Sequence, residues 1–110
     1  MTLRRCIILI SGLLAGCGAA GSAAVCPDAG TALTYDNFGA GFMSVYCVRC
    51  HGPALQEKNL RLETVALVRT NARAGLAYAG TGTSMPPADA AIPSVEDRAK
   101  LTQWLACGAP

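Results

Sequence analysis

The hydrophobic and polar positions along the chain predict helices, and no run of β-branched or aromatic residues alternates as a half-buried strand would. A first helix is expected from about Tyr35 to Cys47, after a capping hydroxyl at Thr34. Gly39 and Gly41 each weaken this helix by roughly 1 kcal/mol relative to alanine, but they let another helix approach closely. Its apolar side chains recur at helical spacing: Phe38, Phe42, Val45 and Tyr46.

Two further helices are expected, one in the middle of the chain and one at its end. The middle helix is predicted from about Leu62 to Tyr78, where one arc collects most apolar residues, although Leu67 falls among the polar ones. The last helix is predicted to begin after Ser94, with acidic residues in its first turn, and to end at Cys107. The pattern predicts an all-α fold of about three helices.

The N-terminal part is predicted to be a signal rather than part of the fold. Arg4 and Arg5 precede an apolar run that is too short to span a bilayer, and small residues follow it. The sequence Leu-Ala-Gly-Cys that ends at Cys17 resembles the lipobox of bacterial lipoproteins, in which the cysteine is acylated and becomes the new N-terminus. The alternative is an ordinary secretory signal that is cut near Ala20 or Ala24.

These features divide the 110 residues into a lipoprotein signal peptide at 1–16, a lipidated flexible tether at 17–33 and one folded domain at 34–110. Acylated Cys17 would anchor the domain to a bilayer, in the bacterial cell envelope and facing the periplasm. Gly18 lacks the acidic character that resembles an inner-membrane retention signal, which favours the outer membrane.

Loss of the signal also changes the charge. The whole chain carries +2, but removal of Arg4 and Arg5 leaves seven basic residues against seven acidic ones. A net charge near zero gives no argument for nucleic acid or for a strongly acidic partner.

The most specific feature is Cys47-Val48-Arg49-Cys50-His51, which contains the only histidine. Two cysteines separated by two residues and followed by histidine predict covalent attachment of one haem. The spacing brings both sulfurs to one edge of the macrocycle, and the next side chain then ligates the iron. Export favours this interpretation, because such attachment takes place outside the bacterial cytoplasm.

Three alternatives compete for the same residues. A structural zinc site would need two more Cys or His ligands, and the chain has no second pair at suitable spacing. A thioredoxin-like redox pair would need strands that alternate with helices. A plain disulfide between Cys47 and Cys50 is possible, but it leaves His51 without a role.

The remaining cysteines of the exported domain are Cys26 and Cys107, since Cys6 is lost with the signal. Free thiols tend to be oxidised or used outside the cytoplasm. By elimination these two are predicted to form a disulfide that closes a loop of about 80 residues and stabilises the fold by up to roughly 4.5 kcal/mol.

Three more residues are candidates for contact with the cofactor. Arg69 and Arg73 fall inside the apolar arc of the middle helix, either with their charged groups in solvent or bound to haem propionates. Met85 lies in a polar loop before two prolines that restrict the backbone, so that it can be presented at a set position.

Together, the CVRCH motif, the Met85-Pro86-Pro87 segment and the last helix resemble a small single-haem class I cytochrome c. The resemblance implies that Cys47 and Cys50 form the thioether bonds, and that His51 and Met85 ligate the iron of haem c. It also implies that the first and last helices cross at Gly39 and Trp104, and that a proline carbonyl, here Pro53, accepts the hydrogen of the histidine ring.

The implied function is electron transfer with redox partner proteins at the membrane surface, rather than enzymatic catalysis. Only 34 positions separate His51 from Met85, fewer than in most members of this family, so one haem edge would be exposed. The alternative is a gas-binding or sensing module in which Met85 is displaced from the iron. Peroxidase activity ranks last, because the sequence offers no second histidine to cleave a peroxide bond.

Overall fold

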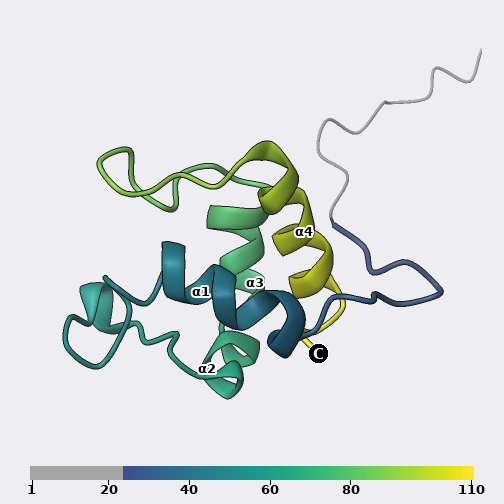
Figure 1. Ribbon diagram of the computed structural model, residues 1–110, viewed down its shortest axis with the longest axis horizontal. Coiled ribbons are helices and arrows are strands. Elements are labelled where there is room, and N and C mark those ends of the chain that lie inside the picture. The colour runs from purple at the N-terminus through teal and green to yellow at the C-terminus, as the bar shows by residue number, and fades with distance from the viewer. Residues whose placement is uncertain (1–23) are drawn as a thin grey trace, which may run out of the picture.

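The computed structural model describes residues 24–110, and the expected signal peptide and Cys17 lie outside this range (Figure 1). The described residues form helices and no β-strand, so the all-α fold class is confirmed for them. None of these helices combines the length and the apolar composition that crossing a bilayer would require. In chain order the elements are η1 (Tyr35–Gly39), α1 (Ala40–Tyr46), η2 (Glu57–Asn59), α2 (Val65–Thr70), α3 (Ala72–Gly75), η3 (Leu76–Gly80) and α4 (Val95–Ala106).

The first predicted helix is present as η1, a π-helical turn, followed directly by α1. Its start is fixed by a capping box, because the Thr34 hydroxyl accepts a hydrogen bond from the Asn37 amide at 3.1 Å. The Asn37 side chain in turn accepts from the Thr34 amide at 2.7 Å. Both ends of this helix agree with the sequence prediction.

The middle helix differs from its prediction, because it starts later and is divided into α2, α3 and η3. It starts at Val65, since Thr64 caps it through the Leu67 amide. Asn71 causes the division: its backbone leaves helical geometry, and its side-chain amide donates to the Leu67 carbonyl at 2.8 Å. The described residues therefore contain four α-helices instead of about three.

The last helix, α4, begins after Ser94, whose hydroxyl accepts from the Asp97 amide at 3.0 Å. It meets the first helix where Gly39 lies against the indole of Trp104, as expected. A Cβ atom on Gly39 would lie 2.3 Å from the Trp104 ring, so only glycine allows this approach. Figure 1 shows α1 and α4 running in different directions.

The hydrophobic core lies where α1, α2 and α4 come together, and Trp104 at its centre is 0% exposed. Phe38 packs edge-on against this indole, with 6.0 Å between ring centroids. The buried apolar residues are Phe42, Met43, Val68, Leu101, Trp104, Leu105 and Ala109.

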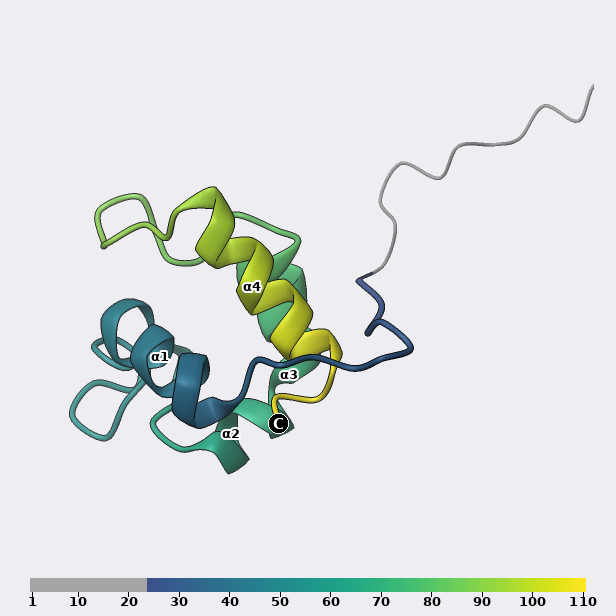
Figure 2. The ribbon, with the colours of Figure 1, turned by 45° about the vertical axis from the view of Figure 1, so that its right-hand side comes forward.

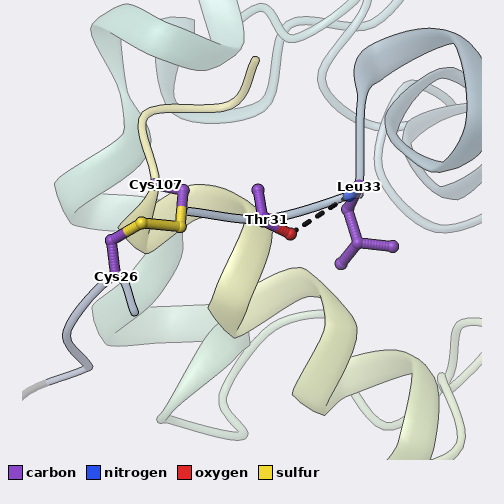
Figure 3. The surroundings of a disulfide bond; sticks show 4 residues. All are labelled: Cys26, Thr31, Leu33 and Cys107. Carbon is purple, nitrogen blue, oxygen red and sulfur yellow. Dashed lines mark hydrogen bonds between the residues drawn. A yellow bond between two sulfur atoms is a disulfide. The ribbon is translucent and has the colours of Figure 1, made fainter. Parts of the chain in front are cut away.

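The two ends of the described chain are held together beside this core. The carbonyl oxygen of Pro110 accepts from the Tyr35 amide at 2.6 Å and from the Trp104 indole at 3.1 Å. Cys26 and Cys107 form a disulfide, with 4.7 Å between their Cα atoms (Figure 3). This is the pairing that the sequence predicts, and it attaches the segment before η1 to the end of α4.

Candidate functional site

The CVRCH residues form a tight turn at the end of α1. The amides of Cys50 and His51 both donate to the carbonyl oxygen of Cys47, at 3.2 and 2.9 Å. One turn of backbone therefore carries both thiols and the imidazole. Gly52 follows, and a Cβ atom there would lie 2.4 Å from the Val48 carbonyl oxygen, so the turn has no room for a side chain at this position.

The two thiols of this turn are not bonded to each other. The disulfide alternative for Cys47 and Cys50 is therefore not what the structure contains, although Cys26 and Cys107 are bonded. Cys47 packs against the core, and its burial raises the pKa of the thiol from 9.0 to about 12. It is thus held as the neutral thiol at physiological pH.

The imidazole of His51 is oriented by the segment that follows it, residues 51–62, here called the His51 loop. Its Nδ1 lies 3.1 Å from the carbonyl oxygen of Glu57. Because a carbonyl can only accept, Nδ1 carries the hydrogen and donates it, which leaves the Nε2 lone pair of the neutral ring free for a metal. The acceptor expected at Pro53 is instead Glu57.

The His51 loop is tied back to the CVRCH turn by its backbone. The Glu57 amide donates to the Cys50 carbonyl at 2.9 Å, and the Leu62 amide donates to the His51 carbonyl at 2.7 Å. Lys58 and Asn59 adopt left-handed backbone geometry, with φ of 57° and 56°, where the chain turns back. The loop thus holds both the backbone and the ring of His51.

Met85 lies on residues 81–94, here called the Met85 loop. Its amide donates to the Tyr78 carbonyl of η3 at 2.9 Å, and the residue is 39% exposed. Figures 1 and 2 place the Met85 loop and the His51 loop at the same end of the molecule, away from the two termini of the described chain. The two loops that carry the predicted iron ligands therefore share one end of the fold.

Sequence reasoning missed Arg98, which contacts the Met85 loop directly. Its Nη1 donates to the carbonyl oxygens of Ala79 at 2.6 Å and Met85 at 2.8 Å, with Gly82 at 3.4 Å. A signal for it exists in the sequence. A cation in the first turn of α4 opposes the helix dipole, which favours a partner outside the helix.

The two arginines predicted to meet propionates differ in their surroundings. Arg69 donates from Nε to the Ala109 carbonyl at 2.9 Å, so that it ties α2 to the C-terminal segment. This contact gives Arg69 a structural role and does not support it as a propionate ligand. Arg73 is exposed on α3 and keeps its place as the candidate.

The side chains of the CVRCH turn, together with that of Met85, are of the kinds that would suit a haem. An unbonded thiol pair, an imidazole with one free nitrogen and a thioether are the groups that hold haem c. In residues 24–110 no three His, Cys, Asp or Glu side chains gather to hold a metal ion. A haem iron does not require such a group of three, since the porphyrin supplies four of its ligands. Large apolar side chains are exposed on α1, the His51 loop, η3 and the Met85 loop: Val45, Leu55, Tyr78, Met85 and Ile92.

Comparisons of the chain with protein-family models, with curated proteins and with solved structures find no match. The function is therefore inferred from the chemistry of the residues at this end of the fold.

Proposed function

We propose that the chain is a membrane-anchored c-type cytochrome that carries electrons through one covalently bound haem. The observation that carries the proposal is the CVRCH turn itself: two unbonded thiols on one turn, followed by an imidazole whose Nδ1 hydrogen is given to the Glu57 carbonyl. A disulfide would use the thiols but leave this oriented ring without a function.

Each residue of the site has a distinct role in this proposal. Cys47 and Cys50 would each add S–H across one haem vinyl group, so that two thioether bonds form and no other product is released. His51 and Met85 would ligate the iron through Nε2 and Sδ. The haem supplies a reversible one-electron change, and the soft methionine sulfur favours the ferrous state.

A carrier should keep its ligands in place in both oxidation states, because their rearrangement would slow electron exchange. The hydrogen bond from His51 to Glu57 resists rotation of the ring. The bond between the Met85 amide and the Tyr78 carbonyl closes the base of the Met85 loop. Arg73, exposed on α3, remains the proposed contact for a propionate.

The proposed location follows from the lipobox-like sequence at Cys17. Acyl chains at Cys17 would restrict the domain to the periplasmic face of a membrane, favoured as the outer membrane, where it would exchange electrons with redox partner proteins.

The test is a visible spectrum and an intact mass of the mature protein, purified with its anchor from a bacterium that has the haem attachment machinery. We expect thioether-haem bands in the reduced protein, a weak far-red band from methionine sulfur on ferric iron, and a mass that contains one haem and acyl chains. Met85→Ala should remove the far-red band while the covalent haem remains.

The other outcomes separate the alternatives. Haem bands without the far-red feature, together with immediate binding of carbon monoxide, would favour the gas-binding module. A protein whose mass contains no haem would refute the cytochrome, and a mass without acyl chains would refute the lipid anchor.

A further inference from the structure

One cationic side chain contacts two carbonyl groups of the Met85 loop and a third in the last turn of η3. Arg98 Nη1 donates to the carbonyl oxygens of Ala79 and Met85 at 2.6 and 2.8 Å, and lies 3.4 Å from that of Gly82. The contacted carbonyl groups lie at the start, the middle and the end of the segment 79–85, and Met85 is its last residue. We define this set of contacts as the Arg98 clamp.

We infer that Arg98 is the positioning residue that holds Met85 for iron ligation. The inference rests on the proposed function, since it assigns to Arg98 the positioning of Met85 as an iron ligand. Hydrogen bonds from a charged donor are stronger than neutral ones, and here one nitrogen of a planar group donates to the backbone on both sides of the junction between η3 and the Met85 loop. Met85 itself is exposed, so that the packing of its side chain does less to fix its place.

The helix that carries Arg98 is a firm support. Leu101 and Trp104, further along α4, are 1% and 0% exposed. Gly80 at the end of η3 lies against Thr102, where a Cβ atom would come within 3.0 Å of the threonine hydroxyl. Arg98 therefore links the Met85 carbonyl to a helix that the core holds in place.

The loop is also confined from its other side. A Cβ atom on Gly82 would lie 2.0 Å from the Ala77 carbonyl oxygen, so the backbone already lies directly against η3. The Met85 amide closes the same segment on the Tyr78 carbonyl at 2.9 Å. The hydroxyls of Thr81 and Ser84 also donate to η3, to the carbonyl oxygens of Leu76 and Tyr78 at 2.9 and 3.4 Å. With the Arg98 contacts removed, the loop would keep these bonds to η3, but the Met85 carbonyl would lose its hydrogen bond to α4.

The test uses the haem-loaded protein and the variants Arg98→Gln and Arg98→Lys. The control is Lys100→Gln, which removes a cation from the same helix whose partner is the exposed Glu96 at 2.9 Å. Three quantities are measured: the far-red band of the ferric protein, the imidazole concentration that displaces Met85 by half, and hydrogen exchange of the amides in residues 79–85. Imidazole is a suitable probe because it competes only for the iron position.

We expect Arg98→Gln to lower the half-displacing imidazole concentration roughly ten- to a hundredfold, with faster exchange in residues 79–85 and a weaker far-red band. Arg98→Lys should fall between this variant and the wild type, because lysine keeps a charged donor but lacks the planar guanidinium that fixes where the donating nitrogen lies. Lys100→Gln should match the wild type in all three measurements.

The inference is overturned if both Arg98 variants bind imidazole and exchange hydrogen as Lys100→Gln does. If Arg98→Gln does not yield haem-loaded protein, Arg98→Lys decides the question by the same comparison. Failure of the proposed function looks different, because the wild type itself would then lack the far-red band.

Discussion

At the scale of single residues, Cys47 is the group whose ionisation the fold changes most. Burial raises its pKa from 9.0 to about 12. In protein that has not received haem, the fraction of Cys47 present as thiolate at about pH 8 should be roughly a thousandfold lower than for an ordinary cysteine. We expect alkylation by iodoacetamide to modify Cys50 first, with the rate at Cys47 still rising above pH 9.

The sign of the linked stability effect follows from the same shift. The unfolded chain loses the Cys47 proton near pH 9.0, whereas the folded chain keeps it until about 12. Stability should therefore fall as the pH rises through this window. Mass mapping of the alkylated residues, with the urea-unfolded chain as the control, measures the alkylation rates of Cys47 and Cys50. Equal rates at Cys47 and Cys50 in the folded chain would contradict the assignment of burial.

Single residues also show where sequence reasoning ends. The CVRCH motif is local, so its chemistry can be read from five consecutive letters. The acceptor for His51 lies six positions along, at Glu57, and its selection depends on left-handed geometry at Lys58 and Asn59. Pro53 was wrongly expected there because backbone carbonyls are identical in sequence, and only the path of the loop distinguishes them.

At the scale of elements, the contact between the first and last helices depends on the missing side chain of Gly39. A methyl group at this position would lie 2.3 Å from the Trp104 ring, which is completely buried and cannot move aside. We expect Gly39→Ala to destabilise the protein by about 1–3 kcal/mol through overpacking, against a helix-propensity gain of about 1 kcal/mol. Urea unfolding followed by circular dichroism measures this difference.

Gly41→Ala is the matched control for this contact. Gly41 lies two residues further along the same helix, and a Cβ atom there meets nothing within 4 Å. Alanine at this position should stabilise the protein by roughly 0.5–1 kcal/mol, because it removes only the entropic cost of glycine. If the two substitutions had the same effect, close packing at Trp104 would not be what requires glycine at position 39.

The ends of the elements were predictable where a local signal exists. Thr34 and Ser94 cap the first and last helices through hydrogen bonds that span three residues, which a sequence pattern captures. The break in the middle helix was not predicted. Asparagine occurs in helices, so Asn71 by itself does not predict a break. In the folded chain its side-chain amide bonds the Leu67 carbonyl and competes with the backbone for it.

At the scale of the whole molecule, stabilisation and chemistry are placed at different ends. The His51 and Met85 loops share one end in Figures 1 and 2, whereas the disulfide joins the first described residues to the end of α4. The C-terminal segment adds further contacts at the second end, from Pro110 to Tyr35 and from Ala109 to Arg69. Changes at this end should therefore alter stability without altering the proposed haem ligands.

Removal of the disulfide tests this separation. The bond joins residues 81 positions apart, so on the chain-entropy model its loss should reduce the free energy of unfolding by up to roughly 4.5 kcal/mol. We expect the double variant Cys26→Ser/Cys107→Ser to unfold at lower urea concentration, as followed by the fluorescence of Trp104, while its far-red band and imidazole binding match the wild type. The Arg98 variants should show the opposite pattern, with weakened methionine ligation and a smaller loss of stability. A double variant that loses methionine ligation as well would show that the two ends are coupled through α4, since Cys107 and Arg98 lie at opposite ends of that helix.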